Sequence, residues 1–279
     1  MRVAVIQMNS RENRLQNVQN ALNLVDRAAN QGAEFVLLPE YMTFLGGYEN
    51  YKKAAESVPG ETSEALAKKA LQHKIYLHGG SLIEKSNDPN RFYNTSLLFS
   101  PSGRLIGTYR KIHLFDIDIP GQVTERESQI ILPGDRLVLV VLPECQLGMS
   151  ICFDLRFPEM YRQLAAAGAE MFVVPSAFAK TTGQVHWEIL LRARAIENHA
   201  YVLAAGQYGK DDQGGEYYGH SMIIGPWGEV IAKSSEDEDC VLLADLDFDE
   251  VRKRRNQIAV LKFRRPDIYQ QPIHLFPEE

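Results

Sequence analysis

Residues 32–40 read Gly32-Ala33-Glu34-Phe35-Val36-Leu37-Leu38-Pro39-Glu40, and residues 168–176 read Gly168-Ala169-Glu170-Met171-Phe172-Val173-Val174-Pro175-Ser176. Each stretch has an unbroken apolar run between a glycine and a proline, which is typical of a short buried strand. The second stretch is almost a copy of the first. The sequence therefore predicts an internal repeat that is built on buried strands.

The likeness extends outward from these two strands. Residues 96–106 and 221–231 also resemble each other, because each contains a Pro-x-Gly turn between two apolar runs. The expected order in both halves is helix, buried strand, helix, strand and hairpin, with helical spacing at 17–29, at 62–73, after Arg156 and at 184–198. Two halves, roughly 1–110 and 145–233, therefore share one plan.

Each half places its strands between helices, which predicts an α/β fold with two packed sheets and helices outside them. The expected architecture is a four-layer α-β-β-α sandwich with an internal pseudo-two-fold repeat. Neither half is a plausible separate domain, so residues 1–279 are expected to form a single domain. Residues 258–279 keep apolar side chains that disordered tails lack. We expect them to form a C-terminal arm that packs on its own body or on a second subunit.

Composition narrows the class of partner. The chain has 279 residues, 45% hydrophobic content and a formal net charge of −6, and its lack of a long basic run argues against nucleic acid and anionic membranes as partners. Its three cysteines form no CxxC pair and leave one over in any pairing, so a disulfide framework is not expected. No signal peptide or membrane-spanning stretch is predicted. A cytoplasmic protein with a small-molecule substrate is expected.

Cys152 follows the apolar run 147–151, and Pro158 stands near the first turn of the next predicted helix. This pattern places the thiol at a strand-to-helix turn, where the helix amino end favours the thiolate. Cys152 is therefore a candidate nucleophile. A single cysteine in an apolar context is equally typical of a small buried core residue.

Chemistry on an acyl group needs a nucleophile, a base and a positive charge where the oxyanion forms. Glu40 ends its buried strand, where α/β sheets present ligands, and is a candidate base. Lys111 directly follows a predicted hairpin. Apolar residues flank it and would hold its ammonium group near a cleft. Glu127 lies in the charged segment 124–128. The alternative interpretations are an exposed glutamate for Glu40, a solvated lysine for Lys111 and a charged loop for Glu127.

Four motifs carry a family resemblance: Leu38-Pro39-Glu40, Tyr109-Arg110-Lys111-Ile112-His113-Leu114, Ile151-Cys152-Phe153-Asp154-Leu155-Arg156-Phe157-Pro158-Glu159 and Pro175-Ser176-Ala177-Phe178. They resemble the Glu, Lys and Cys signatures of the nitrilase superfamily, in family order and over nearly the whole chain. The chain is most similar to the Nit branch, whose members include deaminated-glutathione amidases and ω-amidases.

The resemblance implies an amidase that uses Cys152 as nucleophile, Glu40 as acid and base, and a thioester intermediate. It implies that Lys111 and the backbone N–H of Phe153 stabilise the oxyanion and that Glu127 orients Lys111 and the substrate amide. No cofactor and no metal are expected, since the seven histidines lack ligand spacing.

The expected substrates are ω-amides of 2-oxo dicarboxylic acids, with deaminated glutathione favoured by the resemblance. Arg156 could grip a substrate carboxylate with two hydrogen bonds, or it could pair internally with Asp154 or Glu159. Thr182 and Tyr48 are candidate pocket residues, with helix capping and loop packing as their alternatives. The branch usually carries Pro-Ala where this chain has Gln184-Val185, so a different pocket shape is possible there.

Other functions stay open at this point. The same residues would suit an ω-amidase acting on α-ketoglutaramate or succinamate, or a nitrilase. A catalytically silent scaffold and a metal amidohydrolase are the alternatives of other classes. The helices near 156–168 and 184–198 should share one outer face, and their apolar residues predict a homodimer.

Overall fold

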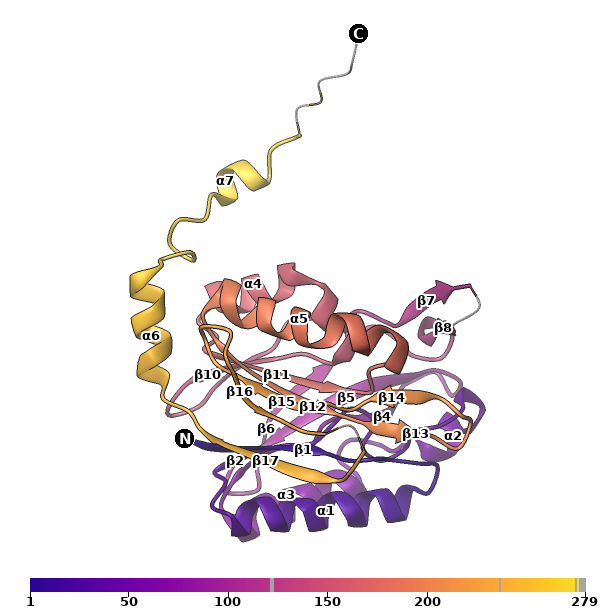
Figure 1. Cartoon of the computed structure of the whole chain (residues 1–279). Helices are drawn as coiled ribbons and strands as arrows, with labels where there is room; N and C mark the ends of the chain where they lie inside the picture. Colours follow the sequence, from indigo (N-terminus) through magenta and orange to yellow (C-terminus); the bar gives the residue numbers. More distant parts are fainter. Residues whose placement is uncertain (121–122, 236, 274, 276–279) are drawn as a thin grey trace.

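The computed structural model describes residues 1–120, 123–235, 237–273 and 275. Two β-sheets lie face to face, and helices cover both outer faces (Figure 1). The helices of one outer face are α1 (Arg14–Asn30) and α3 (Glu61–His73), and those of the other are α4 (Pro158–Ala166) and α5 (Lys180–Asn198). The four-layer α-β-β-α prediction is confirmed.

Within the described residues, the first sheet has seven strands in the order β17-β1-β2-β3-β5-β4, with β6 paired to β5. Its strands are β1 (Arg2–Gln7), β2 (Phe35–Leu37), β3 (Tyr76–His78), β4 (Leu82–Lys85), β5 (Phe92–Phe99), β6 (Leu105–Arg110) and β17 (Cys240–Asp245). The second sheet has six strands in the order β16-β15-β12-β11-β10-β9. Its strands are β9 (Leu139–Val141), β10 (Gln146–Met149), β11 (Met171–Ser176), β12 (Tyr201–Gly206), β15 (Met222–Ile224) and β16 (Val230–Lys233).

The predicted repeat is visible in the strand pairing. Strands β1, β2 and β3 are parallel and β5 joins them antiparallel, while β10, β11 and β12 are parallel and β15 joins them antiparallel. Both hairpins, β5-β6 and β15-β16, shift register at a bulge. Their turns contain Gly103 and Gly228 at φ of 75° and 85°, a backbone conformation that glycine adopts without steric cost.

The apolar runs are unbroken because each central strand is buried on both faces. In β2, Phe35 and Leu37 belong to the core between the two sheets. Their neighbours Val36 and Leu38 face the other way, into a second core together with Leu24 of α1. Side chains alternate across a strand, so one short apolar stretch supplies both layers.

Some element boundaries differ from the sequence-based expectation. Helix α5 begins at Lys180, so Thr181 to Gly183, which resemble a loop in sequence, form its first turn. Helix α1 begins at Arg14, where the Asn13 side chain accepts a hydrogen bond from the Gln16 N–H as an N-cap. No helix among the described residues combines the length and apolar character that a bilayer crossing requires.

Short elements complete the described chain. They are η1 (Tyr48–Asn50), α2 (Tyr51–Ala54), β7 (Asp116–Ile119), β8 (Val123–Arg126), η2 (Glu127–Gln129), η3 (Cys152–Arg156), β13 (Tyr208–Lys210) and β14 (Glu216–Tyr218). The pairs β7-β8 and β13-β14 each form an antiparallel two-stranded sheet.

The C-terminal segment runs away from the body of the protein after α6 (Phe248–Gln257) and carries α7 (Pro266–Tyr269) (Figure 1). Leu261 still packs against the main core, but Phe263 is 74% exposed and Tyr269 66% exposed. Among the described residues beyond Leu261, Phe263 and Tyr269 therefore do not pack on the body of their own chain. Phe276, one of its apolar residues, lies outside the described residues.

Candidate active site

Cys152 occupies a sharp turn directly after β10. It is the first residue of η3, and its φ of 45° lies in the left-handed region that a non-glycine residue seldom adopts. The residue is buried, with 7% exposure, and lines a cavity at the carboxyl end of the strand. The predicted strand-to-turn position of the thiol is confirmed, and its unusual backbone conformation is of the kind found at functional sites.

The expected preference for the thiolate is wrong for the resting site. Burial raises the pKa of the Cys152 thiol well above its ordinary value, and the charge of Glu40 raises it further, while Lys111 only partly opposes this. The α-helix whose amino end should favour the thiolate begins only at Pro158, after the short turn η3. Cys152 is consequently a thiol at neutral pH and needs a base to become a nucleophile.

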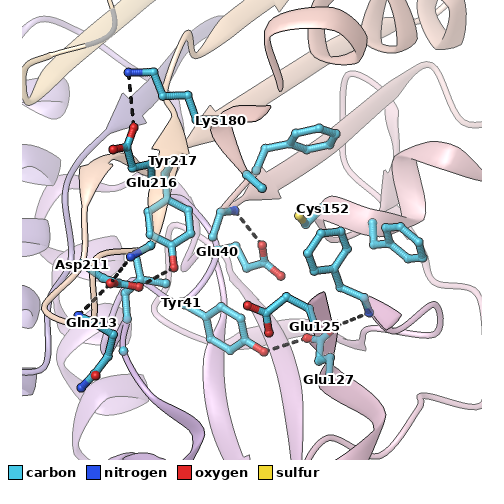
Figure 2. Close-up of a pocket in the computed structure, with 18 of the residues that line it drawn as sticks. Glu40, Tyr41, Glu125, Glu127, Cys152, Lys180, Asp211, Gln213, Glu216 and Tyr217 are labelled. Carbon is cyan, nitrogen blue, oxygen red and sulfur yellow. Dashed lines mark hydrogen bonds and ion pairs between the residues drawn. The ribbon is translucent and has the colours of Figure 1, made fainter. Parts of the chain in front are cut away.

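Glu40 lies just beyond β2 and is 1% exposed. Its Oε1 accepts hydrogen bonds from Nδ2 of Asn94 at 2.9 Å and from Nζ of Lys111 at 3.0 Å. Its Oε2 accepts a bond of 2.6 Å from the backbone N–H of Ala177, which follows β11 of the second sheet. Three donors stabilise the ionised carboxylate, and Figure 2 shows Glu40 and Cys152 at the same cavity. Glu40 is therefore held by three donors at the cavity that Cys152 lines, as a base requires.

Lys111 is a buried ammonium group rather than a solvated one. Its side chain is 2% exposed and its Nζ also lies 2.9 Å from Oε2 of Glu127. Burial lowers the pKa of Lys111, but the charges of Glu127 and Glu40 outweigh burial and raise it well above its usual value. The lysine is therefore a fixed positive charge beside Cys152.

Glu127 is the centre of a second set of hydrogen bonds. In addition to the bond from Lys111, it accepts one of 2.8 Å from the hydroxyl of Tyr41 (Figure 2). It also accepts a bond of 2.6 Å from the backbone N–H of Phe115. It is 3% exposed, at the base of the β7-β8 hairpin. A carboxylate so fully paired holds Lys111 in one position, which agrees with the orienting role expected for it.

Asp154 connects the turn that carries Cys152 to the chain segment around Lys111. The sequence does not reveal this role. Its Oδ2 accepts bonds from the Tyr109 hydroxyl at 2.6 Å and from the Ile151 N–H at 2.8 Å. Its Oδ1 accepts from the N–H of His113 at 3.1 Å and lies 2.8 Å from Nδ1 of that ring. The side chain is fully buried. The signal in the sequence is an aspartate in an otherwise apolar segment two residues after Cys152.

A cavity of about 740 Å³ opens above these residues (Figure 2). Its wall is formed by Glu40, Tyr41, Leu45, Gly46, Gly47, Tyr48, Tyr51, Lys111, Phe115, Glu125, Glu127, Cys152, Phe153, Ala177, Phe178, Ala179, Lys180, Thr181, Thr182, Gln184, Asp211, Gln213, Gly214, Gly215, Glu216 and Tyr217. Tyr48 and Thr182 both line it, as the sequence predicts. Tyr48 donates a hydrogen bond of 2.9 Å to Glu125, and Gln184 lines the cavity while Val185 points to solvent.

Arg156 lies behind this wall rather than in it. Its guanidinium group is 5.1 Å from the ring centre of Phe178 and 5.7 Å from that of Phe153, both of which line the cavity. Its Nη1 is 3.2 Å from Nδ1 of His186. Among the described residues it forms no ion pair with Asp154 or Glu159. The internal pairing that the sequence left open is therefore absent.

The arrangement is suited to acyl transfer. A thiol, a carboxylate with three donors and a buried ammonium group converge on one cavity. The backbone N–H of Phe153 also has no acceptor among the described residues and is free to bind an oxyanion. In the described part of the chain, no cluster of three or more His, Cys, Asp or Glu side chains is placed to hold a metal ion.

Comparison with known proteins gives consistent matches. Residues 2–256 match the family model described as carbon-nitrogen hydrolase. Human omega-amidase NIT2 is 40% identical over 268 residues, which cover 96% of each chain. Nit3 of Saccharomyces cerevisiae, described as a member of branch 10 of the nitrilase superfamily, is 30% identical over 95% of this chain and 96% of its own, with a TM-score of 0.85.

A third match bears on the cysteine. A glutamate-to-glutamine mutant of the amidase from Nesterenkonia sp. AN1 is 27% identical, with a TM-score of 0.82, and the match covers 97% of this chain and 95% of that one. Its structure shows the acetamide moiety of fluoroacetamide added covalently at the active-site cysteine.

Proposed function

Since this chain belongs to the carbon-nitrogen hydrolase family of the nitrilase superfamily, we propose that it hydrolyses the ω-amide of a small carboxylic acid through a thioester on Cys152. The observation that carries the proposal is the meeting of Cys152, Glu40 and Lys111, from three distant parts of the chain, at one cavity. Glu40 is the base, Lys111 the positive charge, and Glu127 the carboxylate that fixes Lys111.

The first half of the reaction forms the thioester. Glu40 takes the proton from Cys152, and the sulfur attacks the amide carbon. The oxyanion that forms accepts hydrogen bonds from Lys111 and from the backbone N–H of Phe153. When the carbon–nitrogen bond breaks, the protonated Glu40 gives its proton to the departing nitrogen, so ammonia leaves from a primary amide.

The second half restores the enzyme. Water enters where the amine left, and Glu40 takes one of its protons as the oxygen attacks the thioester carbon. The same two donors stabilise the second oxyanion. The carbon–sulfur bond then breaks, the acid leaves, and the proton on Glu40 returns to the sulfur. Lys111 keeps its proton throughout, which agrees with the raised pKa that its two carboxylate neighbours produce.

We propose 2-oxo acid ω-amides as the substrate class because the human relative, 40% identical, is named an omega-amidase. Arg156 supplies the positive charge for the far carboxylate. It has no ion-pair partner among the described carboxylates, and it stands directly behind Phe153 and Phe178 of the cavity wall. A side-chain movement of Phe178 would open its guanidinium group to the substrate.

The cavity size favours deaminated glutathione as a second candidate substrate. In that molecule the ω-carboxyl of 2-oxoglutarate is joined to cysteinylglycine, so hydrolysis releases a dipeptide instead of ammonia. A cavity of about 740 Å³ exceeds what a five-carbon amide fills and lies within the range for larger ligands. Rates on deaminated glutathione, α-ketoglutaramate, succinamate and simple nitriles, measured side by side, rank these candidates.

The thioester is tested with Cys152→Ala and with intact-mass analysis. The wild-type protein, quenched during turnover of a slow amide or ester, should gain the mass of the acyl group on Cys152. The alanine variant should gain none and should release no ammonia above background. Retention of full ammonia release by the variant would overturn the proposal, as would a wild-type protein that never acquires the adduct. A wild-type protein that never acquires the adduct would be a scaffold without turnover.

We also propose that residues 1–279 act as one domain whose arm, 258–279, packs in a homodimer. The outward face of α5 exposes Val185, Ile189 and Ile196 at helical spacing, and the arm exposes Phe263 and other apolar side chains. Light scattering should give twice the chain mass, and Ile189→Glu should shift the protein toward monomer. A wild-type monomer at micromolar concentration would contradict the homodimer.

The cytosol is the compartment that we propose for this enzyme. Cys145, Cys152 and Cys240 are all free thiols in the structure, and a reducing compartment keeps a nucleophilic thiol in the form that it needs. Fractionation of cells that express the protein, followed by an amidase assay of each fraction, tests the location.

A further inference from the structure

Three polar side chains, Asn94, Thr95 and Ser96, lie in the middle of the buried strand β5, and the first of them contacts the proposed base. Asn94, in β5, is fully buried and does not belong to the cavity wall. Its Nδ2 donates the 2.9 Å hydrogen bond to Oε1 of Glu40, and its backbone carbonyl accepts a 2.9 Å bond from the N–H of Lys111. The residue therefore touches both charged partners of Cys152 from behind.

The two ends of the Asn94 amide are unequally satisfied. Its Oδ1 is buried, and no donor among the described residues reaches it. An ionised carboxylate only accepts hydrogen bonds, so the NH₂ end must face Glu40 and the carbonyl end must face away. A buried carbonyl without a partner destabilises a fold, so an apolar residue would suit this position better if stability alone decided. The cost is explained if the hydrogen bond to Glu40 has a function.

We propose that Asn94 is a positioning residue which, together with Lys111 and the N–H of Ala177, holds Glu40 ionised and turned toward Cys152. This inference rests on the proposed function, because it assigns Asn94 to the base of that mechanism. Lys111 and Asn94 share Oε1, whereas Ala177 holds Oε2. Three donors from three different strands or turns thus fix both oxygens of the carboxylate.

The sign of the effect follows from the direction of the hydrogen bond. A donor stabilises the charged form of a carboxylate, so its removal makes protonation easier. A protonated Glu40 cannot accept the thiol proton. Activity on the acid side should therefore be lost at a higher pH once Asn94 is replaced, although Asn94 never touches the substrate.

The test is the pH profile of kcat/KM for ammonia release by Asn94→Leu, a substitution that keeps the branching of the side chain at Cγ. We expect the midpoint of the acid limb to move up by about one pH unit, with a thermal midpoint close to that of wild type because the unpaired carbonyl is also removed. A merely structural role would lower the thermal midpoint and leave the acid limb in place. An unmoved acid limb overturns the proposal.

Thr95→Val is the matched control. Thr95 is the next residue of β5 and is also buried, but its hydroxyl donates to Glu84, outside the site. Removal of that bond should leave the acid limb unchanged. If Thr95→Val moves the acid limb of the pH profile as far as Asn94→Leu does, the effect comes from a general disturbance of β5 and not from Asn94. The proposal is then wrong.

Asn94→Asp gives a second variant that keeps the shape of the side chain. It places another carboxyl group beside Glu40, and two such groups share a proton. Its acid limb should lie above that of wild type. An unchanged limb in this folded variant also overturns the proposal. If wild type forms no acyl adduct on Cys152, the proposed function itself fails, whereas a normal adduct with unmoved limbs refutes only the role of Asn94.

Discussion

The ammonium group of Lys111 lies 3.0 Å from Oε1 of Glu40, and neither side chain is more than 2% exposed. Burial of a charge is costly unless a partner of opposite sign is present. Lys111 has two such partners, Glu40 and Glu127, and the three side chains stabilise one another. Removal of the central charge should therefore affect stability and chemistry together.

Lys111→Met keeps the length of the side chain and removes its charge. We expect a loss of about a hundredfold to a thousandfold in kcat, as for loss of an oxyanion donor. We also expect destabilisation of about 3–5 kcal/mol, because two buried carboxylates lose their cation. Steady-state kinetics and denaturant unfolding measure both. Lys68→Met, on the exposed face of α3, should change neither; unchanged kcat in Lys111→Met would exclude an electrostatic role.

Asp154→Asn should loosen the turn that carries Cys152. The aspartate accepts hydrogen bonds from Tyr109, Ile151 and His113. The side-chain amide of an asparagine would place its NH₂ group, a donor, against some of these donors. We expect destabilisation of about 2–4 kcal/mol and slower alkylation of Cys152 by iodoacetamide. Tyr109→Phe removes one bond only and should cost about 1 kcal/mol. Equal unfolding midpoints of Asp154→Asn and wild type would show that the hydrogen bonds accepted by Asp154 contribute little to stability.

A pH effect on stability is expected far from the site, where Asp26 of α1 meets α3. Its carboxylate lies 2.6 Å from Nζ of Lys69 and 2.7 Å from Nε2 of His73. Partial burial raises the pKa of Asp26, but hydrogen bonds and charge from Lys69 and His73 outweigh burial and lower it. A lowered pKa stabilises the fold above the unfolded value of about 3.9, and the contribution is lost as the pH falls through the folded value.

Asp26→Asn should accordingly be less stable than wild type at pH 7, by up to about 1 kcal/mol for a pair that solvent screens. The difference should shrink below about pH 4, and kcat should not change at any pH. Thermal unfolding of both proteins between acidic and neutral pH measures it. A difference that stays constant down to the acid range would mean that packing, and not charge, explains the change.

The sequence is informative where one local pattern decides the structure. The apolar runs at 32–40 and 168–176 predict buried strands because a strand covered on both faces must be apolar at every position. Glu40 and Cys152 can then each be placed at the carboxyl edge of its own sheet, because each follows a strand of a parallel set. The repeat makes this inference stronger, because the two halves have to obey the same rule.

Features that depend on tertiary contacts could not be predicted. Lys111 resembles any lysine at a hairpin end, and only contact with two distant carboxylates makes its burial tolerable. The thiolate expected for Cys152 is wrong for the same reason, because burial and the charge of Glu40 raise the pKa of the thiol. Asn94 gives no signal of its own, because it stands in the polar run Asn94-Thr95-Ser96 of β5, and its role emerges only from its hydrogen bond of 2.9 Å to Glu40.

Arg156→Met tests how the substrate carboxylate is bound. The methionine keeps much of the packing against Phe153 and Phe178 and removes the charge that we assign to the far end of an ω-amide substrate. A hydrogen bond to a charged group contributes about 1.5–3 kcal/mol, so kcat/KM for α-ketoglutaramate should fall about tenfold to a hundredfold. The loss should be mostly in KM, because the carboxylate is bound equally in the ground and transition states.

A neutral amide of similar length separates this role from a structural one. Butyramide has no carboxylate, so Arg156→Met should hydrolyse it at nearly the wild-type rate, and the preference for α-ketoglutaramate over butyramide should collapse. Arg156→Lys should restore only part of that preference, because an ammonium group lacks the planar fork that binds a carboxylate with two parallel hydrogen bonds. Equal losses on both amides would mean that Arg156 supports the fold of the Cys152 turn, and the carboxylate site would then have to be sought at Lys180, the cation of the cavity wall other than Lys111.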